Sequence, residues 1–182
     1  KYINKAIHYL TLAANQNDPE APYNLGVIYY EGKYVTKDVV KAINYFKMAD
    51  NYAPAQFFLG FIYNDKDINK AIYYYSLSAK QNYAQALLNL GVIYYEGKYV
   101  TKDITKGIRY FTLAADKNNL QAQINLGFIY YEGKFINRDI NKAIHYFTLA
   151  ADKNDSESQF MLGLIFLEGK FIKRNIENSI NY

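Results

Sequence analysis

The chain has 182 residues, of which 51% are hydrophobic, and a formal net charge of +4. This length and apolar content allow one domain with a substantial core and exclude an intrinsically disordered chain. The sequence contains no cysteine, which excludes disulfides and thiolate metal sites, and its modest charge does not by itself favour a nucleic-acid binder. No apolar run reaches the roughly 20 residues that a membrane-spanning helix needs, so we expect no membrane segment. With no signal peptide visible either, the sequence favours a cytoplasmic location.

The chain repeats itself. The segment NLGVIYYEGKYVTKD stands at residues 24–38, returns letter for letter at 89–103, and returns slightly changed at 125–139. Leu-Gly pairs place glycines at Gly26, Gly60, Gly91, Gly127 and Gly163. A second anchor, a small residue followed by isoleucine, falls at Ala6, Ala42, Ala71, Gly107, Ala143 and Ser179. Because both anchors recur every 36 residues over most of the chain, we infer a repeat architecture.

Each repeat predicts two helices. In the first helix, Ala21, Leu25, Ile28 and Tyr29 recur at helical spacing and define one apolar face. The second helix likewise has one apolar face, formed by Val39, Ala42, Phe46 and Ala49. A glycine stands where a left-handed C-terminal cap of the first helix belongs, at Gly32, Gly97, Gly133 and Gly169. An N-capping residue precedes the second helix, at Asp38, Asp67, Asp103, Asp139 and Asn175. Each link to the next unit holds an asparagine, which tolerates the left-handed conformation, at Asn17, Asn82, Asn118 and Asn154.

The second unit departs from this pattern. Its segment YNDKDINKA lacks the EGKYV loop of the other copies, and two further residues are missing around DNYAPA. We therefore predict a local change in the path of the stack at this unit.

A helical hairpin of this size cannot bury both of its faces, whereas hairpins stacked side by side can. The sequence thus predicts an all-α, right-handed solenoid over residues 1–182, with five first helices and six second helices, the last one cut short at Tyr182. Small residues such as Gly26 and Ala42 would let the helix axes approach closely. Since the pattern begins and ends within a repeat, we expect the chain to be a fragment of a larger protein.

The pattern A-x-x-x-L-G-x-x-Y-x-x-G, followed by D-x-x-K-A-x-x-[YF]-[YF]-x-x-A-A, resembles the Sel-1-like repeat. The segment APYNLGVIYYEGKYVTKDVVKAINYF carries this pattern nearly whole, and the resemblance covers essentially the entire chain. The related tetratricopeptide repeat fits less well, because its tryptophan position is occupied here by Pro22, Gln56, Leu87, Gln123 and Gln159. The resemblance implies a scaffold or adaptor that holds other proteins together.

The resemblance also implies that the first helices line the concave side of the solenoid. Counting from the Leu-Gly anchor places a second apolar stripe on these helices, and we expect it to bind a peptide or helix of a partner protein. The stripe consists of Tyr23, Val27, Tyr30, Phe57, Phe61, Leu88, Val92, Tyr95, Ile124, Phe128, Tyr131, Phe160 and Leu164. The alternative is that neighbouring first helices bury these side chains against one another.

Charged residues also recur. One row comprises Glu31, Glu96, Glu132 and Glu168, and a second comprises Lys33, Lys98, Lys134 and Lys170. We interpret both rows as solvated loop charges.

The sequence predicts no catalytic residue, metal or cofactor, and we expect a protein that is not an enzyme. The only histidines, His8 and His145, share one repeat position four units apart, so they cannot form one site. Two alternatives to a peptide-binding scaffold stay open. One is a structural spacer or self-assembling element of a larger complex. The other, an RNA-binding helical repeat, is disfavoured because the stripe is almost entirely apolar.

Overall fold

The computed structural model describes the backbone of residues 2–180 and the side chains of residues 2–169. This part of the chain forms helices and no strand, which confirms the all-α solenoid. The first helices of the repeats are α2 (Glu20–Glu31), α4 (Ala53–Tyr63), α6 (Ala84–Glu96), α8 (Leu120–Glu132) and the beginning of α10 (Ser156–Ile180). The second helices are α1 (Tyr2–Ala14), α3 (Val39–Met48), α5 (Ile68–Lys80), α7 (Ile104–Asp116) and α9 (Ile140–Ala151). None of the described helices is both long and apolar enough to cross a membrane.

The predicted caps are present in the complete repeats. Gly32, Gly97 and Gly133 adopt φ angles of 68°, 67° and 64°, and each donates its backbone N–H to an isoleucine carbonyl of the helix that it ends. The carboxylate of Asp38 accepts the backbone N–H of Lys41 at 2.9 Å, and the same bond recurs at Asp67, Asp103 and Asp139. The link asparagines Asn17, Asn82, Asn118 and Asn154 all have φ angles between 61° and 64°. Local sequence therefore determines where these helices begin and end.

Each hairpin closes around an aromatic ring that lies against a glycine. A Cβ atom on Gly26 would come within 2.5 Å of the Phe46 ring, and Gly91 and Gly127 stand in the same relation to Phe111 and Phe147. In the second unit the ring is that of Tyr75, which lies against Gly60. The small residue of the second helix is fully buried at Ala42, Ala71 and Ala143. These contacts bring the two helices of a unit close together, as the sequence predicts.

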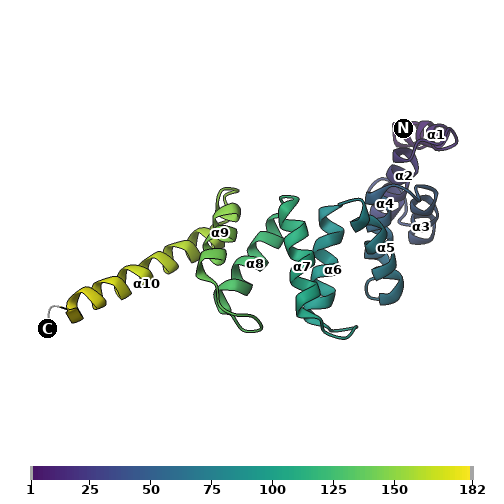
Figure 1. Ribbon diagram of the computed structural model, residues 1–182. Helices are drawn as coiled ribbons and strands as arrows, with labels where there is room; N and C mark the ends of the chain where they lie inside the picture. The colour runs from purple at the N-terminus through teal and green to yellow at the C-terminus, as the bar shows by residue number, and fades with distance from the viewer. Residues whose placement is uncertain (1, 181–182) are drawn as a thin grey trace.

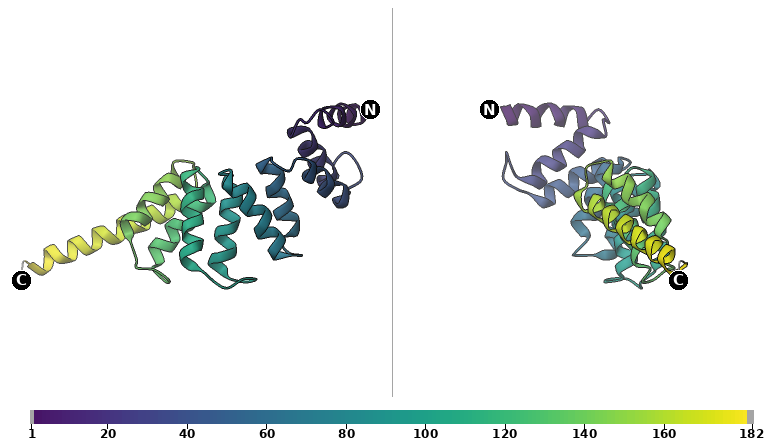
Figure 2. Two further views of the ribbon diagram at one scale, coloured as in Figure 1. Left: turned by 45° about the vertical axis from the view of Figure 1, so that its right-hand side comes forward. Right: turned by 90° about the vertical axis from the view of Figure 1, so that its left-hand side faces the viewer.

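The path of the stack turns near its N-terminal end. Figure 1 shows α5 to α9 side by side in a row, whereas α1 to α3 lie out of this row, and Figure 2 shows the same turn from two further sides. The turn occurs where α3 meets α4. Residues 49–52, which link these helices, contain no left-handed asparagine, unlike the other four links. The turn therefore lies at the beginning of the shortened second unit.

The end of the chain differs from the prediction. The sequence predicts that Gly169 ends a helix and that Asn175 begins the last one, but α10 continues without a break from Ser156 to Ile180. In the other units the returning second helix places a ring on the Leu-Gly glycine, whereas no described atom lies within 4 Å of a Cβ on Gly163. Without that packing, continued helical hydrogen bonding is favoured over a turn. The side chains of Lys170 and Ser179, and the whole of Tyr182, lie outside the described residues.

Candidate functional site

The predicted stripe forms three rows along the first helices, and the first row is partly core. Leu88 and Ile124 are only 6% and 7% exposed, and Leu88 belongs to a core cluster with Phe111 of α7 and Leu126 of α8. Tyr23 and Phe57 are half-buried among other aromatic rings, with the Tyr23 and Phe58 centroids 5.9 Å apart. Phe160, on α10, is exposed. Part of this row is therefore core, as the alternative interpretation of the stripe expects.

The second row lies nearer the surface. Val27, Val92, Phe128 and Leu164 are half-buried, and Phe61 is 49% exposed. Phe61 still contacts a ring of the preceding first helix, since its centroid lies 6.4 Å from that of Tyr30. The side chains of this row are therefore partly exposed.

The third row consists of half-buried tyrosines that each lie beneath a basic side chain. Lys37 lies 4.9 Å from the centroid of the Tyr30 ring, Lys102 lies 6.0 Å from Tyr95, and Arg138 lies 5.1 Å from Tyr131. Cations at these distances are attracted to the ring face. The signal that could have revealed these pairs is the constant spacing of seven residues between ring and cation.

Two hollows of about 260 Å³ each open between successive first helices. One lies between α4 and α6 and the other between α6 and α8, and both are lined by Val92 and Glu96, so they adjoin. We call these two neighbouring hollows together the first-helix groove. Phe61, Phe128 and Tyr95 of the predicted stripe line it. Glu96 and Glu132 also line it, although the sequence pattern indicates only loop charges at these positions.

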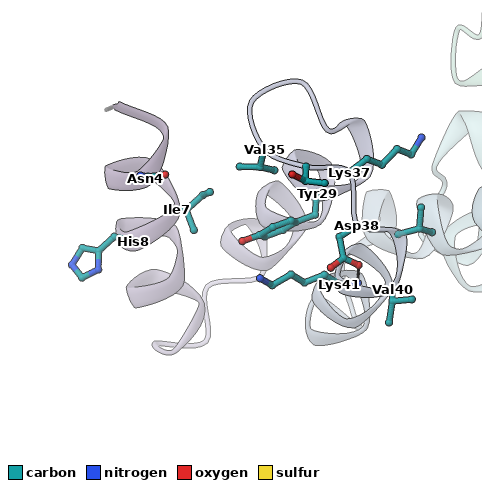
Figure 3. A pocket seen from close by; sticks show the side chains of 11 residues that line it. Asn4, Ile7, His8, Tyr29, Val35, Lys37, Asp38, Val40 and Lys41 are labelled. Carbon is teal, nitrogen blue, oxygen red and sulfur yellow. Dashed lines mark hydrogen bonds between the residues drawn. The ribbon is translucent and has the colours of Figure 1, made fainter.

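A larger cavity, of about 770 Å³, lies elsewhere, between α1 and the loop that joins α2 to α3 (Figure 3). Its polar groups already have structural partners. Asp38 caps α3, and the Lys41 ammonium lies 4.4 Å from the centroid of the Tyr29 ring. The His8 ring points to the outer side of α1 in Figure 3. An equivalent cavity recurs around Tyr130, so we regard this feature as the crevice between stacked units.

Stacked tyrosine pairs run along the same side as these crevices, and sequence reasoning missed them. Four pairs have centroids 5.6–5.9 Å apart and nearly parallel rings, namely Tyr29–Tyr45, Tyr63–Tyr74, Tyr94–Tyr110 and Tyr130–Tyr146. The lysine three residues after each capping aspartate lies over the first ring of the pair, most closely for Lys106 and Tyr94, at 3.7 Å. A hydrogen bond to Tyr94 raises the pKa of Lys106. These groups stabilise the hairpins and leave the first-helix groove as the best candidate site.

The helical hairpins are stacked, and each buries its apolar faces against its neighbours. This arrangement, with a groove on the first helices, defines an α-solenoid of the kind that binds other proteins. The Sel1 repeat model matches this chain at residues 3–18, 19–49, 53–83, 84–119, 120–155 and 156–182. The chain therefore belongs to the Sel1 repeat family. Proteins of this family are generally non-catalytic scaffolds for protein interactions.

Similar proteins come from viruses and bacteria. A Sel1-like repeat-containing protein of Acanthamoeba polyphaga mimivirus is 42% identical over 104 residues, which cover 54% of this chain and 19% of that protein. The alginate biosynthesis protein AlgK of Pseudomonas syringae pv. tomato is 40% identical over 62 residues, covering 34% of this chain and 13% of AlgK. The chain thus spans less than a fifth of these curated relatives.

Solved structures of Sel1 repeat proteins have the same fold. One is a protective antigen of uropathogenic Escherichia coli strains with an SLR fold, which is 31% identical to this chain and has a TM-score of 0.83. The match covers 90% of this chain and 36% of the antigen chain. A Sel1 repeat protein from Oxalobacter formigenes matches 91% of this chain and 70% of its own with 30% identity and a TM-score of 0.81.

Proposed function

We propose that this chain acts as a scaffold or adaptor by binding an apolar segment of another protein in the first-helix groove. The observation that carries the proposal is the pair of adjoining hollows between α4, α6 and α8, which leave side chains of the second row open to a ligand. Aromatic side chains at such a surface are effective anchors, since each can bury about 150–250 Å². Phe61 and Phe128 would supply these anchors.

The proposal assigns different roles to the rows of the stripe. Leu88 and Ile124 are buried, so they would support the floor of the groove without touching the partner. The tyrosines of the third row, each beneath a cation, would form one wall. Glu96 and Glu132 would favour a basic residue in the partner beside its apolar side chains. No catalytic role is proposed, and the two histidines are both exposed and lie outside the groove.

Site-specific photocrosslinking tests this function. A photoreactive phenylalanine analogue replaces Phe61 in one preparation and Tyr73, which is 59% exposed on α5, in a matched control. Crosslinks from native extract should identify a partner segment from position 61 and not from position 73. That segment, made as a peptide, should bind about tenfold more weakly to Phe61→Ser and unchanged to Tyr73→Ser. Equal binding by both variants, with folding verified by circular dichroism, would refute the groove as the binding site.

A second candidate function is association between copies of the chain, and the exposure of the two end helices favours it. α1 occupies a second-helix position but buries none of its residues, and Tyr9 is 67% exposed where the equivalent Tyr45 is half-buried. α10 presents a first-helix face on which no described atom covers Gly163. α1 of one copy could therefore cover α10 of another. Such head-to-tail contacts join two different surfaces, so further copies can be added to the assembly in the same way.

A further inference from the structure

The two hollows of the first-helix groove are the same site in successive repeats, and their linings differ in chemistry. Counted from the Leu-Gly anchor, five residues of the hollow between α4 and α6 correspond one by one to five of the hollow between α6 and α8. They are Phe61 and Val92, Asn89 and Asn125, Val92 and Phe128, Ile93 and Ile129, and Glu96 and Glu132. The first hollow has Asn64 where the second has Tyr95 and Tyr75 where the second has Phe111, and Lys98 and Tyr99 line only the first.

Asn64 follows from the shortened second unit. In the neighbouring units a tyrosine stands at this position, and the basic residue of the following loop lies over its ring. The second unit has neither the tyrosine nor that loop, since only residues 64–67 separate α4 from α5. A short polar side chain therefore borders the hollow where the other units place an aromatic ring.

Tyr75 adds a buried hydroxyl to the same hollow. Its ring lies against Gly60, as phenylalanine rings do in the other units, and its side chain is 0% exposed. The hydroxyl makes no hydrogen bond of regular geometry among the described residues, although the Asn89 side chain lies close enough to interact with it. Burial raises the pKa of Tyr75 to about 12, while the hydrogen-bonding interaction with Asn89, also part of the lining, lowers it. The group is thus a neutral donor at physiological pH, and a buried donor without a partner is unfavourable.

The remaining lining determines which ligand would fit. Glu96 and Lys98 carry opposite charges, so the hollow has no net charge to attract an ion. Asn64 and Asn89 provide both donors and acceptors, and Phe61 and Ile93 provide apolar surface. The volume of about 260 Å³ is smaller than that of ordinary small-molecule sites, and it suits one side chain of a larger ligand.

We propose that the hollow between α4 and α6 is a specificity pocket for the carboxamide side chain of a glutamine or asparagine in the partner segment. Its oxygen would accept a hydrogen bond from the Tyr75 hydroxyl once the side chains that cover this hydroxyl move aside, and its NH₂ group would donate to the asparagine oxygens or to Glu96. A carboxylate has no N–H to donate to these acceptors, and an aliphatic side chain would leave the hydroxyl unpaired. The hollow between α6 and α8, with Phe111 in place of Tyr75, would accept an apolar side chain instead. This inference rests on the proposed function of the groove.

Selection from a phage-displayed library of random peptides tests the pocket. Peptides selected on the wild-type chain should be enriched in glutamine or asparagine at one position. A selected peptide in which leucine replaces that residue should bind about tenfold more weakly to the wild type. Tyr75→Phe, which makes the position match Phe111, should bind both peptides almost equally. Because Tyr75→Phe removes only an unpaired hydroxyl, its melting temperature should be unchanged or raised, which verifies that the variant folds.

The outcomes separate the pocket from the groove. If selected peptides bind in the groove and are weakened by Phe61→Ser, but show no preference for a carboxamide, the specificity pocket is refuted and the groove stands. The pocket is also refuted if Tyr75→Phe retains the full preference of the wild type for the glutamine or asparagine peptide. If Phe61→Ser leaves the binding of every selected peptide unchanged, both proposals fail.

Discussion

The ring of Phe147 lies so close to Gly127 that a Cβ atom on the glycine would come within 2.5 Å of it. The ring is itself fully buried, in a core cluster that also contains Met161 and Ile165 of α10. A side chain at position 127 would therefore have to displace the ring or separate α8 from α9.

Gly127→Ala should lower the free energy of unfolding by about 1–3 kcal/mol, because the added methyl overpacks the hairpin. The matched control is Gly163→Ala. No described atom lies within 4 Å of that Cβ, and alanine is the better helix former, so this variant should be neutral or up to about 1 kcal/mol more stable. Urea denaturation followed by circular dichroism measures both. Equal effects of the two substitutions would contradict the close contact between Gly127 and the Phe147 ring.

Asn82 links α5 to α6 with a φ angle of 61°. Asn82→Ala should destabilise the chain by about 1–2 kcal/mol, because a Cβ-bearing residue without a polar side chain is strained in this conformation. Asn82→Gly should retain nearly the full stability, since glycine adopts positive φ without strain. Thermal unfolding of the two variants distinguishes backbone strain from loss of a side-chain contact, which would affect both alike.

Hydrogen bonds from the Lys70 side chain and backbone N–H lower the pKa of Asp67 below its ordinary value of 3.8. A carboxyl group whose pKa is lower in the folded state stabilises the fold above its unfolded pKa, and this contribution is lost as the pH falls through the folded pKa. Asp67→Asn keeps an N-capping side chain but cannot titrate. The wild type should therefore lose more stability than Asp67→Asn as the pH is lowered from about 5 to 2. Parallel pH profiles of stability for the two proteins would disprove this assignment.

If copies associate through α1 and α10, the average mass measured by light scattering should rise with protein concentration without any added partner. Tyr9→Glu should suppress the rise, because it places a charge on the uncovered face of α1, where Tyr9 is 67% exposed. Tyr73→Glu, on the similarly exposed position of α5, serves as the control. A constant mass at all concentrations would rule out this second candidate function.

Most of the fold could be predicted because each structural requirement recurs several times along the chain. A glycine, an aspartate and an asparagine stand at fixed places in the repeat, and each corresponds to one backbone conformation that few other residues adopt as well. The unbroken α10 could not be predicted in this way, because Gly169 favours a turn only where a following helix packs against the unit. The sequence shows that Gly169 can cap a helix, but it does not show which helices surround this glycine in the fold.

The candidate site was less predictable. Leu88 and Ile124 were predicted to face a ligand, but both are buried, and Leu88 lies in a cluster formed by α6, α7 and α8 together, an arrangement that no single helix encodes. The unpaired hydroxyl of Tyr75 is likewise invisible to patterning, since tyrosine and phenylalanine occupy the same apolar position. The adjoining hollows form only where neighbouring units are placed together.

Because α1 buries none of its residues, it should open before the helices that follow it. In an array where each unit contacts only its neighbours, a helix with little buried surface opens locally while the rest stays folded. Amide hydrogens of α1 will therefore exchange with solvent before those of α6 to α8. A ligand that spans α4, α6 and α8 would thus rest on a more slowly exchanging part of the molecule.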